Sequence, residues 1–470
     1  MVFSEYLFVF LFLPVFLLVY SVSPRALRNV VLLAASLLFY WIGEGKGLWL
    51  LIAVIIGNYA VARLIQRALE QSRNGRARLW VTIGVAGNLC ALAWFKYIGF
   101  LTTNANEIAR LFGAEGAVVP VVQVALPLGI SFFVFQGISY VVDVYRGTST
   151  ATRSLLNFAT YKAMFPQLVA GPIVRYADVA QELVVRNPDA DMRFEGMRRF
   201  LVGFAKKVLL ADTFAWVADA AFAVPHAELS AGLAWTGALA YALQIYFDFS
   251  AYSDMAIGIG LIMGFRFPEN FNYPYIAGSI KDFWRRWHMT LSRWFRDYVY
   301  IPLGGNRKGA ARTYANLLLV FFLTGLWHGA SWTFVIWGLW HGSFLMLERI
   351  TNLDRLRSIP VLRHVYVLGV VLVGWVMFRA DDFPYAFGML KAMAGLGQGT
   401  RVAAEFLDPV VWFATVAGFV FCTPAYGHAR NAIGPRYAML VGVPLFGTAF
   451  VLASAKVLTG AYSPFLYFRF

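Results

Sequence analysis

Long apolar runs recur along the whole chain, and they limit its possible folds more than any other feature. Since about 20 helical residues cross the hydrocarbon core of a membrane, they predict an all-α polytopic bundle of about 10 to 12 spans. Residues 1–470 are expected to form a single transmembrane domain. The runs in the first third are Val2–Tyr20, Val30–Gly43, Leu48–Ala62, Leu79–Leu101 and Val118–Val142. The later runs are Phe200–Ala223, Gly232–Phe265, Asn316–Trp327, Trp332–Leu347, Val365–Phe378, Val410–Cys422 and Ala438–Leu458.

The composition excludes a soluble enzyme. Charged residues make up 14% of the chain, against roughly 25% in a soluble domain. The net charge of +15 would suggest a nucleic-acid partner in a soluble protein. In a membrane protein, however, Lys and Arg concentrate in the cytoplasmic loops. We therefore expect membrane lipids, and no nucleic acid, as partners.

Some of the apolar runs cannot be simple spans. Gly232–Phe265 is too long for one crossing, and two prolines bound the segment Phe165–Pro172. Proline breaks a helix, and broken helices persist at membrane depth only where protein or a water-filled cavity covers them. The sequence therefore predicts re-entrant and interfacial helices around a cavity.

The least apolar segment, Ser279–Arg312, begins SIKDFWRRWHMTLSRWFRDYVYIPLGGNRKG. As one helix it would carry a polar face and an opposing, mostly aromatic face. Such a helix is expected in the membrane interface, with Trp rings at headgroup depth, and it either covers a cavity or is purely structural. The polar face would consist of Lys281, Arg285, His288, Ser292 and Arg296, and the aromatic face of Trp284, Trp287, Leu291, Trp294 and Tyr298.

His328 is the strongest candidate for chemistry inside an apolar run, Asn316–Gly329 (NLLLVFFLTGLWHG). If the helix begins near Asn316, His328 lies about 18 Å along it, near the middle of the hydrocarbon core. A titratable group at that depth is a functional candidate by default, although a neutral histidine bonded to a backbone carbonyl is the alternative. Gly325 and Gly329 would let a substrate or another backbone approach closely.

The remaining polar residues in apolar runs are weaker candidates for a functional site. His341 lies in a second Trp-His-Gly triplet, whereas His226, His364 and His428 are expected to be structural or solvated. Asp248 and Asp254 lie within a predicted span. They are expected to pair with Arg or Lys of the interfacial helix, or to bond to Tyr and Ser, in a structural role. No nucleophile elbow or zinc-ligand pair is present, so chemistry would rest on histidine without a metal.

At these segments the sequence resembles the membrane-bound O-acyltransferases, and specifically the bacterial alginate O-acetyltransferase type. The resemblance runs nearly end to end and includes the opening MVFSEYLFVFLFLPVF and the closing SPFLYFRF. Between them, the motifs in order are WFKY (Trp94–Tyr97), LPLGISFFVFQGISYVVDVYRG (Leu126–Gly147), FPQLVAGPIVR (Phe165–Arg175), YFDFSAYSDMAIGIG (Tyr246–Gly260), WRRWH, LGGNRKG and GLWHG.

The resemblance implies a tunnel through the bundle, with His328 as the essential histidine and His288 as the second motif histidine. It implies an acetyl donor in the cytoplasm, acetyl-CoA, and no bound cofactor. The acetyl group would cross a bacterial inner membrane to a periplasmic partner similar to SGNH hydrolases, which modifies an exported polysaccharide such as alginate. Proteins of polysaccharide biosynthesis and export are further expected partners. Asp212 also looks typical of the family, without an assigned role.

Acyl transfer from a thioester needs a base for the accepting hydroxyl and donors for the oxyanion. We expect His328, kept neutral by its apolar surroundings, to be that base. His288 would either orient the acceptor or donate to the oxyanion. The cations Lys281, Arg285, Arg286 and Arg296 could attract the CoA phosphates. Further candidate contacts to donor or substrate are Ser292, Asn306 and Trp327.

Three alternatives stay open at this point. The same fold and histidine could transfer D-alanine to teichoic acid, or could O-acetylate peptidoglycan. The chain could also be a transporter or flippase without chemistry. Transporters often show repeated halves with paired broken helices, and this sequence shows no such internal symmetry.

Overall fold

The structure is a computed structural model that describes residues 3–351, 358–460 and 465–466, with the side chains of 430 and 435–439 left out. Within these residues the regular structure is helical, apart from one isolated bridge between Leu229 and Arg401. The chain divides into two compact units, residues 1–194 with 259–268, and residues 195–258 with 269–470. The prediction of a single domain stays a prediction.

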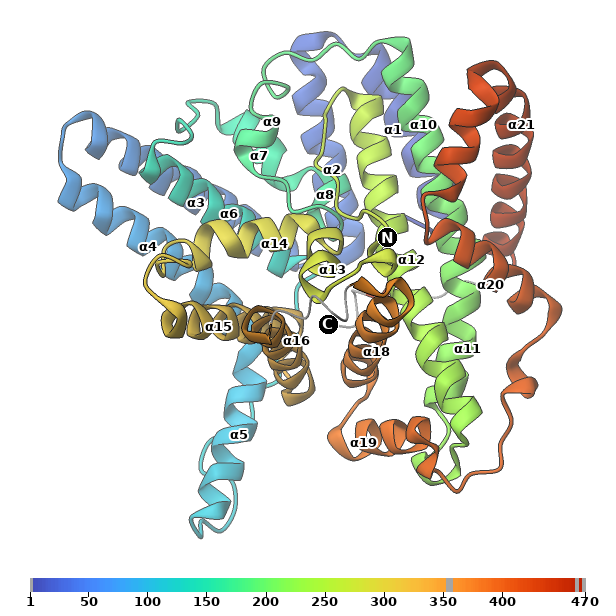
Figure 1. The fold of residues 1–470 in the computed structure, drawn as a ribbon. Helices are drawn as coiled ribbons and strands as arrows, with labels where there is room; N and C mark the ends of the chain where they lie inside the picture. The colour runs from blue at the N-terminus through green and yellow to red at the C-terminus, as the bar shows by residue number, and fades with distance from the viewer. Residues whose placement is uncertain (1–2, 352–357, 461–464, 467–470) are drawn as a thin grey trace. The chain divides into compact units, whose positions relative to one another are not determined.

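The first unit is built from the N-terminal helices (Figure 1). Its helix α3 packs against α4, and both pack against α6. Where the three meet, Asn58 and Asn88 exchange hydrogen bonds of 3.2 and 2.8 Å. A Cβ at Gly137 would lie 2.6 Å from Asn88 Oδ1, so glycine is needed for this packing. The helices are α1 (Leu13–Val22), α2 (Arg28–Glu44), α3 (Gly47–Glu70), α4 (Asn74–Leu92), α5 (Ile98–Leu111), α6 (Ile130–Arg146), α7 (Leu155–Ala163), α8 (Phe165–Leu168) and α9 (Tyr176–Val179).

The second unit contains the longer C-terminal part of the chain. Helices α10 and α12 begin or end in the first unit but lie mostly in this one. The helices are α10 (Ala190–Ala205), α11 (Asp212–Phe222), α12 (Ala231–Met263), α13 (Ile280–Arg286), α14 (Met289–Phe295), α15 (Ala310–His328), α16 (Trp332–Thr351), α18 (Pro360–Arg379), α19 (Phe383–Lys391), α20 (Pro409–Phe421) and α21 (Ala425–Leu458).

Glycines bring α15 and α16 into close contact. A Cβ at Gly325 would collide with the carbonyl oxygen of Phe334, and a Cβ at Gly338 with that of Phe321. A Cβ at Gly329 would meet the Phe334 ring. The expected close approach at Gly325 and Gly329 is therefore made by another part of the same chain.

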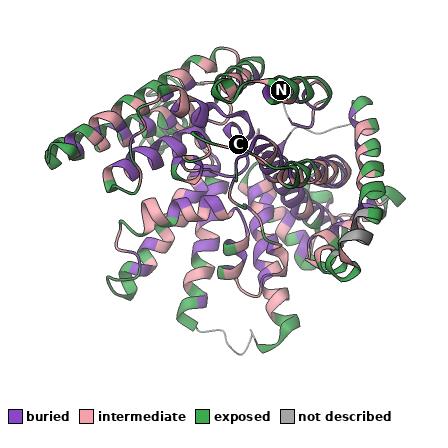
Figure 2. Cartoon of the chain, turned by 90° about the horizontal axis from the view of Figure 1, so that it is seen from above, coloured by how far each residue is buried: buried purple, intermediate pink, exposed green. Residues whose placement is uncertain are grey.

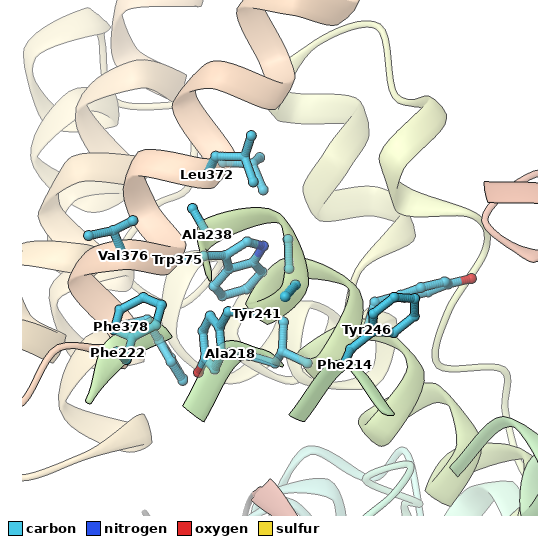
Figure 3. Close-up of a cluster of buried hydrophobic side chains, with 14 of the residues drawn as sticks. Phe214, Ala218, Phe222, Ala238, Tyr241, Tyr246, Leu372, Trp375, Val376 and Phe378 are labelled. Carbon is cyan, nitrogen blue, oxygen red and sulfur yellow. The ribbon is translucent and has the colours of Figure 1, made fainter. Parts of the chain in front are cut away.

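A large aromatic and aliphatic core holds the second unit together. Side chains of α11, α12 and α18 meet in it (Figure 3), among them Phe222, Tyr241 and Trp375. Many helices bury one side and expose the other (Figure 2). Exposed apolar side chains are numerous, Trp49 and Phe413 among them, as expected where lipid covers the surface.

The prediction of an all-α polytopic membrane bundle is confirmed, with fewer clear spans than expected. Within the described residues, six helices are long and apolar enough to cross a membrane, or seven if the bent pair α20 and Ala425–Gly434 counts as one. Several predicted runs fold as shorter helices, such as α6 with 17 residues and α20 with 13.

Two expectations about individual runs are wrong. Val118–Val142 is not one helix: α6 begins only at Ile130, after Pro120, Pro127 and a left-handed Gly129. Gly232–Phe265 was expected to break, but α12 is continuous over 33 residues. The helix break predicted at the prolines of Phe165–Pro172 is confirmed, since α7 ends at Ala163 and α8 covers only Phe165–Leu168.

Candidate functional site

The segment expected to be one interfacial helix is broken in the middle. Helix α13 ends at Arg286, and α14 begins at Met289 (Figure 1). Between them Trp287 is extended and His288 has φ 41° and ψ 55°, the left-handed region that non-glycine residues rarely adopt. A preceding loop supports the break, because Met289 N–H donates to Asn270 O at 2.9 Å and Asn272 N–H to Arg286 O at 2.9 Å. Strained conformations of this kind cluster at functional sites.

The break makes the predicted polar face wrong. His288 is buried, while Lys281, Arg285 and Arg296 are exposed. The expected aromatic face is also not at a surface, since Trp284, Trp287, Leu291 and Trp294 are buried.

Four other predicted site residues are held by neighbours or lie on the surface. Arg286 pairs with Asp282 at 3.0 Å, and Arg296 pairs with Asp297 at 2.7 Å. The Ser292 hydroxyl donates to Trp284 O at 3.2 Å. Asn306 is exposed in the turn that precedes α15.

One tautomer of His288 follows from its contacts. Asn270 Oδ1 accepts from the Thr290 backbone N–H at 3.3 Å, so the amide orientation is fixed. Asn270 Nδ2 donates to Ser253 at 3.1 Å. His288 Nδ1, 3.0 Å from Asn270 Oδ1, must therefore carry the proton and donate. Nε2 is left as an acceptor, and it is buried without a hydrogen-bond partner among the described residues. Burial lowers the pKa of His288 to about 3, so the ring stays neutral.

His328 is the last residue of α15 and is buried. The assumed helix start near Asn316 is wrong, because α15 begins at Ala310. His328 is therefore about 27 Å along α15 instead of about 18 Å. Its ring centroid lies 5.0 Å from that of Trp337 and 5.1 Å from that of Phe378, both edge-on.

A chain of aromatic contacts connects the histidines. The Trp327 ring centroid is 5.8 Å from that of His288 and 4.9 Å from that of His328. Trp337 continues the chain from His328 to His341, at 5.3 Å. We call these five residues the histidine–tryptophan cluster. Of the nine predicted site residues, the structure brings three into this cluster: His288, Trp327 and His328.

The sequence reasoning did not identify Asn270 and Trp337. Trp337 and His341 are four residues apart on α16, a spacing that places them on one face and could have suggested the contact. Asn270 lies in an irregular loop, and no periodicity indicates where its side chain points. Only the hydrogen bonds between this loop and the break at His288 show that Asn270 orients the histidine.

The two aspartates of α12 pair with cations, as expected, but with different ones. Asp248 lies 2.8 Å from Lys207, and Asp254 lies 2.7 Å from Lys206 and 3.0 Å from Arg199. These partners come from α10 and the π-helical segment after it, so the expectation of partners from the interfacial helix is wrong. Asp212 shares Lys207 at 2.6 Å.

The other histidines lie outside the cluster. His226 is exposed, and His364 Nδ1 lies 3.1 Å from Ala277 O. Among the described residues, no group of three or more His, Cys, Asp or Glu side chains is arranged to hold a metal ion.

The fold and the cluster define a helical membrane protein with buried histidines at a helix end and a helix break. The model of the membrane-bound O-acyltransferase family matches residues 148–381, which include the whole cluster. The chain belongs to this family and is an O-acyltransferase.

Within the family it falls into the subfamily of the alginate O-acetylases. The probable alginate O-acetylases AlgI of Azotobacter vinelandii and Pseudomonas putida are each 43% identical to it over the full length of both chains. A peptidoglycan O-acetyltransferase of Helicobacter pylori is 38% identical, over 87% of this chain and 84% of the relative.

Proposed function

We propose that this O-acyltransferase moves an acetyl group from cytoplasmic acetyl-CoA across the inner membrane, for O-acetylation of an exported polysaccharide such as alginate. The observation that carries the proposal is the contact of His288, Trp327 and His328, which joins the two motif histidines through one indole ring. The names of the full-length relatives support alginate as the polymer.

In the proposed reaction His328 is the general base. It takes the proton of the accepting hydroxyl, whose oxygen attacks the thioester carbonyl. The C–S bond then breaks, an oxygen ester forms, and the proton passes to the leaving thiolate. No metal or bound cofactor takes part in this scheme.

His288 has the orienting role in this mechanism. With its proton on Nδ1, its Nε2 can only accept, so it can hold a hydroxyl but cannot donate to an oxyanion. Of the two roles open from the sequence, the tautomer favours orientation of the acceptor.

Exposed cations support a cytoplasmic donor with phosphates. Lys281, Arg285 and Arg296 flank the helix break and are exposed. Arg and Lys attract phosphate at range and bind it by charge-assisted hydrogen bonds. Arg286 is partly occupied by Asp282 and Arg296 by Asp297, so both are weaker donor contacts than Lys281 and Arg285.

The proposed acceptor in the periplasm is a partner similar to SGNH hydrolases, working with the proteins of polysaccharide biosynthesis and export. A test compares His328→Ala with wild type in cells that make the polymer. We expect the variant to reach wild-type abundance in the membrane while the polymer loses its O-acetyl groups. Wild-type acetate content in that variant would contradict the assignment.

Peptidoglycan O-acetylation is the second candidate, because a named peptidoglycan O-acetyltransferase matches most of both chains. The two acceptors separate in one experiment: after deletion of the gene, ester-linked acetate is measured in exported polymer and in purified peptidoglycan. Loss from peptidoglycan alone would favour the second candidate.

A further inference from the structure

The residues Phe465 and Leu466 contact α12 beside the cluster, and the proposed chemistry gives them no role. The Leu466 backbone N–H donates to Asp248 Oδ2 at 2.6 Å. The Phe465 ring centroid lies 4.8 Å from that of Tyr252 and 6.2 Å from that of Phe249. All of these side chains are buried.

Asp248 belongs to a buried ionic group. Its Oδ1 lies 2.8 Å from Lys207 Nζ, which also contacts Asp212 at 2.6 Å. A buried carboxylate needs partners for both oxygens, because burial of an unpaired charged or polar atom is unfavourable. Lys207 forms an ion pair with one oxygen, and the Leu466 N–H donates to the other.

Phe249 connects this attachment to His288. It follows Asp248 in α12, and its ring centroid is 4.7 Å from that of His288, at an interplanar angle of 90°. The His288 ring is thus bounded by Asn270 at Nδ1, by Trp327 and by Phe249. Phe465 packs on Phe249 and therefore supports one of these three contacts.

We propose that Phe465 and Asp248 are positioning residues for His288. Asp248 fixes the backbone at Leu466, which keeps Phe465 against Phe249 and Tyr252. Phe249 then holds the His288 ring in the orientation that leaves Nε2 open. Neither residue touches the reacting atoms. The expected effect of replacing these residues on turnover rests on the proposed function. The expected effect on the orientation of the His288 ring does not.

The test uses full-length protein with Phe465→Ala, the bulk-restoring Phe465→Leu, and Phe450→Ala as a control. Phe450 packs 5.7 Å from Phe204, centroid to centroid, so its removal also costs an aromatic contact. The first readout is the imidazole NMR spectrum of histidine-labelled protein in detergent, where the chain has six histidines. His288→Asn identifies the His288 signal.

We expect Phe465→Ala to shift or broaden the His288 signal and leave that of His364 unchanged, while Phe450→Ala changes neither. In acetyl transfer from acetyl-CoA, Phe465→Ala should lower kcat about 10- to 100-fold with KM within about twofold, because small misplacements cost rate. Phe465→Leu should recover most of the loss.

An unchanged His288 signal in Phe465→Ala would overturn the proposal, as would an equal loss of kcat in Phe450→Ala. If wild-type protein transfers no acetyl group, the proposed function fails, and the NMR comparison alone decides the positioning role.

Discussion

At the scale of single residues, the orientation of His288 depends on an amide outside the motifs. Asn270 Oδ1 accepts from His288 Nδ1, from the Thr290 backbone and from the Thr290 hydroxyl at 2.8 Å. All three donors are buried in the second unit. Asn270 therefore fixes both the histidine tautomer and the first turn of α14.

Replacement of Asn270 tests this dependence. We expect Asn270→Ala to lower kcat strongly and to destabilise the protein by about 1 to 3 kcal/mol, because buried donors lose their acceptor. Asn272→Ala in the same loop is the matched control, since Asn272 bonds to α13 through its backbone. The measurements are steady-state acetyl transfer and thermal unfolding in detergent. Equal behaviour of the two variants would contradict the role given to Asn270.

The buried His288 ring also predicts a pH dependence of stability. Its folded pKa of about 3 lies below the ordinary 6.5, so folding favours the neutral ring. This contribution is complete above about pH 6.5 and is lost as the pH falls, by up to about 1.4 kcal/mol per pH unit. We expect the melting temperature of wild type to fall more steeply than that of His288→Asn between pH 6.5 and 4.5. Parallel curves would show that His288 is not buried in neutral form.

At the scale of the element, helix periodicity misplaced the polar residues of the segment from Ser279. A period of 3.6 places Lys281, Arg285 and His288 on one face only if the helix is continuous. The break at Trp287 and His288 depends on hydrogen bonds to a loop about 17 residues earlier in the chain. The spacing of residues within the segment carries no information about this loop. The prediction therefore placed the exposed cations and the buried His288 on one helix face, which is wrong.

Helices α15 and α16 pack closely near the end of α15. At Gly338 of α16 a side chain would not fit, because its Cβ would collide with the Phe321 carbonyl oxygen of α15. This close approach places Trp337 beside His328. The apolar runs predicted both helices, and Gly325 and Gly329 predicted the close approach of a substrate or another backbone. Neither indicated which side chains would meet His328.

Gly338→Ala is therefore expected to separate α15 from α16. Because the obstacle is backbone, we expect a loss of roughly 1 to 3 kcal/mol in stability and reduced turnover. Gly57→Ala in α3 is the control, since no atom lies within 4 Å of the added Cβ. Thermal unfolding and acetyl transfer are measured for both. A Gly338→Ala protein as stable and active as Gly57→Ala would contradict the close packing.

At the scale of the whole molecule, apolar runs and motifs predicted the fold class and the family, and both are confirmed. The apolar runs predicted about 10 to 12 spans, whereas six or seven described helices are long and apolar enough to cross a membrane. The length of an apolar run does not show where the helix begins. α6 starts late because of Pro127 and Gly129, and α15 starts early, at Ala310. The pairing of Asp248 and Asp254 with cations was predictable from the cost of buried charge, whereas the identity of those cations required the packing of α10 on α12.

The most direct test of the proposed reaction is transfer of labelled acetyl from acetyl-CoA by the purified chain in proteoliposomes, supplied with the proposed periplasmic partner. We expect wild type to transfer label to the partner or polymer. His328→Ala, folded and inserted to the same extent, should transfer less than about one part in 100, the order expected for loss of a general base. Transfer at the wild-type rate by His328→Ala would contradict the role of His328 as the base.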